Sequence, residues 1–265
     1  SAERWNIFQE AVVPTLINMI RESPAGEYSF FGGKKFVIQV SVKEPDWDSI
    51  EKELNNGHAV LSATAQNQMA ELELYLITLR NEKGGHSNVL CLNHVLKTIE
   101  YFEPNGSYLL DEQSEKAVKH LLSLCTKLYP DYTELHPDDT CPKIDIHTLY
   151  SNKDRFGVQS SMPDNSEFAG TCFFWSLWFI YTRVQHPSIY PGDMLTAAFE
   201  EALQVDTATP AQADPDDLYS YGPTRLESFI VAFIRMLYTN TNLKVQFKIR
   251  NSNKIYYPSP VDVVD

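Results

Sequence analysis

Hydrophobic and polar positions follow two different periods along the first quarter of the chain. Apolar residues between Trp5 and Ile20 recur at helical spacing, and Pro14 among them predicts a kink or a break. Residues 36–42 alternate with the period of a strand and follow a Gly32-Gly33 turn. A short helix is expected from Asp48 to Leu54.

The middle of the chain has the pattern of an antiparallel meander. Three strand-like segments, 71–79, 88–93 and 97–102, follow one another, and Gly84-Gly85 supply the first turn. Such a meander commonly buries one face and leaves the other in water. A helix is then expected to begin at Asp111 and to end before proline 130, because its leucines share one side.

The segment from Cys172 to Val184 differs from the other predicted helices because it is apolar around most of its circumference. A helix of that kind occupies the buried centre of a domain. A short strand (144–150) and a loop (152–170) are expected before it, and a helix (224–237) and an edge strand (244–249) after it. The pattern predicts an α+β fold in which the Cys172 helix packs on a mainly antiparallel sheet. Residues 1–70 are expected to form an N-terminal accessory region and residues 71–265 the main domain.

Charge narrows the class of partner. The 265 residues include 22 Lys and Arg against 35 Asp and Glu, which gives a formal net charge of -13. This charge repels phosphate backbones and anionic lipids, so we expect neutral or basic partners, not nucleic acid or a membrane surface. The most apolar stretch, Cys172 to Tyr181, is about half as long as a membrane span.

Cysteine and cofactor motifs are informative mainly by what they exclude. The four cysteines, at positions 91, 125, 141 and 172, form no CxxC pair and predict reduced thiols in a cytoplasmic setting. The seven histidines contain no HxxxH pair, and the sequence has neither a GxGxxG nor a GxxxxGK loop. We therefore expect no metal and no nucleotide cofactor.

Three residues carry candidate chemistry. Cys172 begins the buried helix, where unpaired backbone N–H groups stabilise a thiolate and lower the pKa of the thiol. His86 opens one strand of the meander and Glu103 ends the next, 17 residues later, so a hairpin would bring them together. Glu103 would then orient His86 as the general base for the thiol. Taken singly, each residue has a structural alternative: a buried apolar cysteine, a turn histidine and a turn glutamate.

The order and context of these residues resemble a known family. Residues 85–90, 97–106 and 170–177, with Gln159 between the last two segments, are similar to the cysteine-peptidase clan of SUMO-specific proteases and the adenovirus maturation protease. The similarity is greatest to divergent clan members from large DNA viruses, and it covers roughly residues 71–184.

The resemblance implies a papain-like, SUMO-protease-like fold and a set of catalytic roles. The implied roles are nucleophile for Cys172, general base for His86, orienting carboxylate for Glu103 and oxyanion-hole donor for Gln159. Gln159 lies 13 residues before Cys172, farther than in the family, so Asn165 is the alternative donor. Ser87 stands where SUMO proteases have a tryptophan.

The implied activity is that of a thiol protease which hydrolyses peptide or isopeptide bonds in a protein substrate. Removal of ubiquitin or a ubiquitin-like modifier is favoured, because an acidic enzyme suits a basic modifier tail. Maturation of a viral polyprotein, in the host cytoplasm or the virion, is one alternative. Acetyl transfer by a clan-related effector enzyme is another, although the charge of -13 disfavours anionic coenzyme A. A non-catalytic binding module is the remaining alternative.

Overall fold

The structure is a computed structural model, and most of the residues it describes lie before residue 205. They are residues 2–24, 29–31, 36–64, 70–82, 84–104, 111–140 and 171–204, followed by 229–230, 232–233, 236–237, 247–248 and 255–256. The predicted strand at 144–150 and loop at 152–170 lie outside these ranges. Among the described residues, no helix is both long and apolar enough to cross a membrane.

A mixed sheet of six strands forms the centre of the fold. Its order is β1-β3-β4-β5-β6, and β2 also pairs with β3. The strands are β1 (Ser29–Phe31), β2 (Val37–Ser41), β3 (Leu72–Asn81), β4 (Gly84–Asn93), β5 (Thr98–Phe102) and β6 (Thr133–Leu135). The predicted antiparallel meander is present as β3, β4 and β5. The flanking strands are parallel: β1 and β2 pair with successive parts of β3, and β6 pairs with β5.

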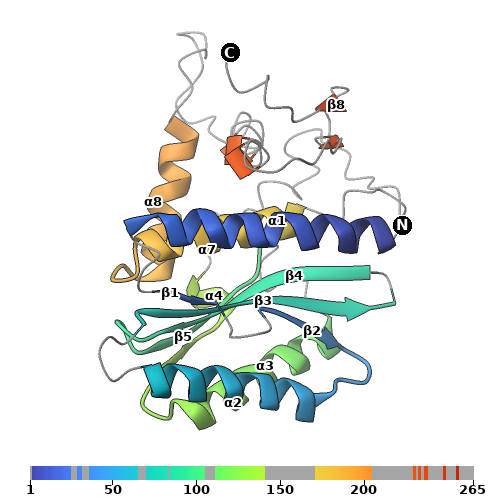
Figure 1. The fold of residues 1–265 in the computed structure, drawn as a ribbon, viewed down its shortest axis with the longest axis vertical. Helices are drawn as coiled ribbons and strands as arrows, with labels where there is room; N and C mark the ends of the chain where they lie inside the picture. Colours follow the sequence, from blue (N-terminus) through green and yellow to red (C-terminus); the bar gives the residue numbers. More distant parts are fainter. Residues whose placement is uncertain are drawn as a thin grey trace.

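Helices cover both faces of this sheet (Figure 1). One layer contains α1 (Ala2–Glu22) and α7 (Thr171–Gln185), from which α8 (Pro191–Gln204) extends away from the sheet, and the other contains α2 (Trp47–Thr64) and α3 (Glu112–Leu128). Successive side chains of β3 therefore enter different hydrophobic cores: Leu74 and Leu76 pack in the α7 layer, whereas Tyr75 and Ile77 pack in the α2 and α3 layer. The mixed α+β class is confirmed. The expectation of one exposed sheet face is wrong, because both faces are covered.

The first 70 residues take part in the same sheet and cores. Two strands, β1 and β2, lie in this region, and α1 packs against α7. Of the kink or break predicted at Pro14, the break is absent: α1 continues through Pro14 and buries Val12 and Leu16. The second helix, α2, is longer than expected and runs through Gly57, where a Cβ atom would lie 2.1 Å from the Tyr75 hydroxyl. The predicted accessory region thus supplies part of the framework around β3.

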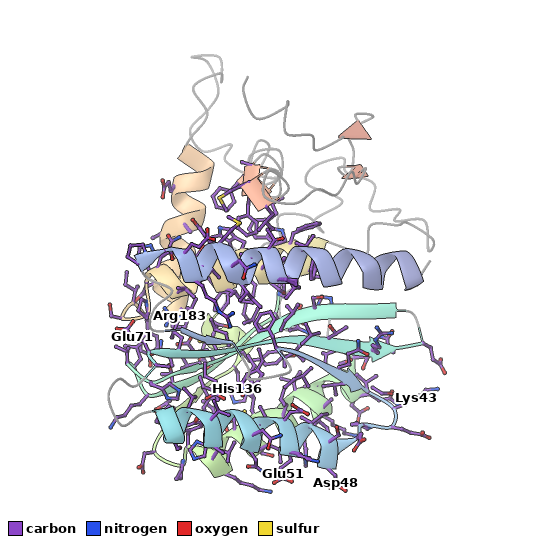
Figure 2. All side chains as sticks on the ribbon, viewed as in Figure 1. Lys43, Asp48, Glu51, Glu71, His136 and Arg183 are labelled. Carbon is purple, nitrogen blue, oxygen red and sulfur yellow. The ribbon has the colours of Figure 1, made fainter. Side chains whose placement is uncertain are left out.

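The remaining elements are short or follow the predicted pattern. The helix expected from Asp111 is α3, and the Asp111 carboxylate caps it by accepting a 2.8 Å hydrogen bond from the Ser114 N–H. Residues 137–140 form α4 beside β5. Within the predicted tail strand, the structure describes β7 (Phe247–Lys248), which pairs with β8 (Ile255–Tyr256). Figure 2 shows how side chains fill the space between the sheet and each helix layer.

Candidate active site

The hairpin of β4 and β5 brings His86 and Glu103 together. Its last paired position is Val89 opposite Phe102, so Glu103 follows β5 directly and His86 lies three residues before Val89. Nε2 of His86 is hydrogen-bonded to Oε1 of Glu103. The Glu103 side chain is almost fully buried, with 1% exposed, whereas 25% of the His86 side chain is exposed. The imidazole is therefore bonded to a buried carboxylate, while part of the His86 side chain remains exposed to solvent.

The start of α7 adds Cys172 to this pair. The Cys172 thiol forms a hydrogen bond with the His86 side chain, and the backbone N–H of Ser87 donates to the same sulfur. Because Glu103 occupies Nε2, the other ring nitrogen, Nδ1, is the one available to the thiol. The structure thus places a thiol, an imidazole and a carboxylate in one continuous chain of hydrogen bonds.

The ionisation of Cys172 and His86 is coupled. Burial alone would raise the pKa of the Cys172 thiol, but the charge and hydrogen bond of His86 and the Ser87 N–H outweigh it, so this pKa is lowered. Burial likewise opposes the charge on His86, yet Glu103 and then Cys172 raise the pKa of the imidazole well above its ordinary value. Both shifts favour the form of the pair in which Cys172 is a thiolate and His86 an imidazolium. This is the reactive form of a nucleophilic cysteine.

The other two cysteines that the structure describes have the opposite character. Cys91 and Cys125 are fully buried, and burial is the main cause that raises the pKa of each thiol. Nearby carboxylates add to the shift, Glu100 beside Cys91 and Glu73 beside Cys125. Of these three thiols, Cys172 is the one whose surroundings favour a thiolate.

A stripe along α7 faces the two strands that carry His86 and Glu103. It consists of Cys172, Ser176, Phe179 and Arg183, which are spaced by four, three and four residues and so share one side of the helix. The Phe179 ring stacks on the ring of Phe102, the residue before Glu103, with centroids 4.3 Å apart. Because this helix is so apolar, the sequence analysis did not single out its polar residues Ser176 and Arg183. Their helical spacing from Cys172 could have indicated that they lie on the same side of the helix.

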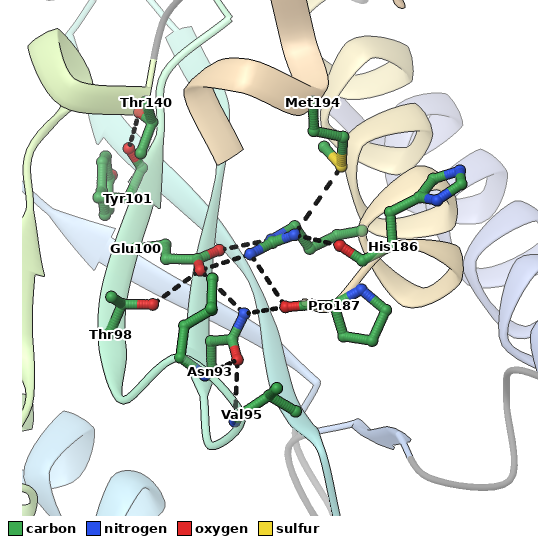
Figure 3. Close-up of polar contacts among 11 residues, drawn as sticks. Asn93, Val95, Thr98, Glu100, Tyr101, Thr140, His186, Pro187 and Met194 are labelled. Atoms are coloured by element: carbon green, nitrogen blue, oxygen red, sulfur yellow. Dashed lines mark hydrogen bonds and ion pairs between the residues drawn. The ribbon is translucent and has the colours of Figure 1, made fainter. Parts of the chain in front are cut away.

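Arg183 anchors the far end of this stripe to Glu100, whose polar contacts are drawn in Figure 3. Its Nε and Nη2 donate to the two carboxylate oxygens of Glu100 on β5, at 2.7 and 2.8 Å. Asn93 and Thr98 donate to the same carboxylate, so both charges, which are fully buried, have partners. The ion pair fixes α7 against β5 about three helical turns from Cys172.

Two predicted site residues, Gln159 and Asn165, lie outside the described residues. Ser87 is described and is 3% exposed, with its N–H directed at Cys172. Within the described ranges, no three His, Cys, Asp or Glu side chains gather as metal ligands would.

Comparison with known proteins gives one partial similarity to report. No protein-family model matches the chain. A protein of Acanthamoeba polyphaga mimivirus that is named as an ankyrin repeat protein is 26% identical over 131 residues. The match covers 46% of this chain and 16% of that protein, so this chain spans less than a fifth of its length.

Proposed function

We propose that the protein is a thiol protease of the SUMO-protease-like clan that uses Cys172, His86 and Glu103 as its catalytic triad. The observation that carries this proposal is the hydrogen-bonded chain from the Cys172 thiol through the His86 imidazole to the buried Glu103 carboxylate. These contacts lower the pKa of the Cys172 thiol and raise the pKa of the His86 imidazole. A buried cysteine ordinarily has a raised pKa, so the lowered one supports a nucleophilic role for Cys172.

The geometry supports a two-step hydrolysis. The Cys172 thiol transfers its proton to Nδ1 of His86, and the thiolate attacks the scissile carbonyl carbon. The C–N bond breaks as His86 returns the proton to the leaving amine, which leaves a thioester on Cys172. His86 then deprotonates a water molecule that hydrolyses the thioester and regenerates the thiol. Glu103 keeps the ring in position and stabilises the imidazolium.

The charge developing on the substrate oxygen also requires donors. The backbone N–H of Cys172, at the start of α7, is the first donor we propose, because N–H groups in the first turn of a helix lack intrahelical acceptors. A side-chain amide, Gln159 or Asn165, is the second.

Ubiquitin or a ubiquitin-like modifier is the substrate we favour. The net charge of -13 supports attraction to a basic C-terminal tail. The second candidate is maturation of a viral polyprotein, which the resemblance of residues 85–90, 97–106 and 170–177 to clan members from large DNA viruses supports. Both functions use the same triad and differ in the segment presented to Cys172.

The proposal is tested with two electrophilic probes that react covalently with a catalytic cysteine. Ubiquitin and SUMO bearing a C-terminal propargylamide would be incubated separately with the protein and with its Cys172→Ala variant, and intact masses recorded. We expect one covalent adduct on the unaltered protein and none on the variant. Failure of both probes, together with Cys172-dependent cleavage of a peptide library, would favour polyprotein processing. Failure of both, with no Cys172-dependent cleavage, would contradict protease function.

A further inference from the structure

Ser176 and Ser87 form a buried contact beside the proposed nucleophile. The Ser176 hydroxyl donates a 3.0 Å hydrogen bond to the backbone carbonyl of Ser87, across the interface between α7 and β4. Ser176 is fully buried and Ser87 is 3% exposed, so water does not compete for this bond. Neither side chain has a role in the proposed chemistry.

The backbone of Ser87 contacts α7 at two points. Pairing of β4 with β5 ends at Val89, so Ser87 lies beyond the paired part of that edge. Its N–H donates to the Cys172 sulfur and its carbonyl accepts from Ser176, one helical turn further along α7. Ser87 is thus hydrogen-bonded to Cys172 through its N–H and to Ser176, in the next turn of α7, through its carbonyl.

We infer that Ser176 is a positioning residue, which fixes the first turn of α7 so that the Cys172 sulfur lies against both His86 and the Ser87 N–H. This inference rests on the proposed function of the triad. An apolar side chain would fill the same volume, but it would leave the Ser87 carbonyl buried without this donor and remove a directional contact between the second turn of α7 and β4. Sliding or rotation of α7 would then lengthen both bonds to the thiol.

The inference predicts a change in the pH dependence of Cys172 in Ser176→Ala. Alkylation by iodoacetamide would be followed by peptide mass spectrometry across pH 5 to 9, so that no substrate is needed. In Ser176→Ala we expect the inflection for Cys172 to move to higher pH and the rate at pH 6 to fall about 10-fold, the scale of losing one buried hydrogen bond. Ser176→Thr, which keeps the hydroxyl, should keep the profile of the unaltered protein.

A matched control separates positioning from stability. Thr126→Ala removes a half-buried hydroxyl that contacts the Leu122 carbonyl, also at 3.0 Å, and the Glu134 carboxylate, in α3 on the other face of the sheet. We expect thermal unfolding to shift in both alanine variants but the Cys172 profile to shift in Ser176→Ala alone. An unaltered profile in Ser176→Ala, or an equal shift in Thr126→Ala, would overturn the inference. An ordinary thiol profile in the unaltered protein would instead overturn the proposed function.

Discussion

Replacement of Cys172 by alanine is expected to abolish turnover and to leave the fold intact. The thiol supplies the attacking atom, so its loss removes covalent catalysis altogether, and we expect a fall in kcat of about 10⁴-fold or more. The assay is cleavage of the substrate that the modifier probes or the peptide library identify. Cys125→Ala is the matched control, because it removes another buried thiol, from the α2 and α3 layer. Comparable activity loss in the two variants would contradict the assignment.

The other triad residues should give a graded series. His86→Ala removes the group that moves the proton, and we expect a loss of about 10³-fold. Glu103→Ala should cost less, because the imidazole remains and loses only the carboxylate that orients it and raises its pKa. If Glu103→Ala left activity unchanged, another carboxylate would be the partner of His86.

The largest effect on stability is expected at Arg183. Its guanidinium is fully buried, and Arg183→Met would leave the Glu100 carboxylate charged and buried without its main partner. Breaking such a pair costs about 3–5 kcal/mol in the free energy of unfolding. Urea denaturation followed by circular dichroism would measure this loss.

An exposed ion pair provides the comparison for Arg183. Lys119 pairs with Glu115 one turn away on the surface of α3, where both side chains are more than half exposed. Lys119→Met should therefore change stability by less than about 1 kcal/mol. If Arg183→Met costs no more than Lys119→Met, the buried pair does not hold α7 on the sheet.

The sequence predicted those elements whose signals are local. Alternation and a glycine turn marked β3 and β4, and the side that its leucines share marked α3. The spacing of His86 and Glu103 reflects the length of one hairpin, which made their approach predictable from the chain alone.

Features set by long-range packing were not predictable in the same way. The strands β1 and β6 have three residues each, too few for alternation to be recognised. The continuity of α1 through Pro14 depends on Val12 and Leu16 packing in the α7 layer, a contact that local propensity does not contain. The roles of Ser176 and Arg183 likewise depend on which strands α7 faces.

The central claim is that His86 activates the Cys172 thiol. Its most direct test is the pH dependence of iodoacetamide labelling at Cys172, Cys91 and Cys125, resolved by peptide mass spectrometry in the unaltered protein and in His86→Ala. A lowered pKa keeps the thiolate present at lower pH, so Cys172 should be labelled rapidly near pH 6 while Cys91 and Cys125 are not. In His86→Ala the Cys172 inflection should move to higher pH. Equal labelling of the three thiols near pH 6, or a Cys172 profile that His86→Ala leaves unchanged, would contradict the account.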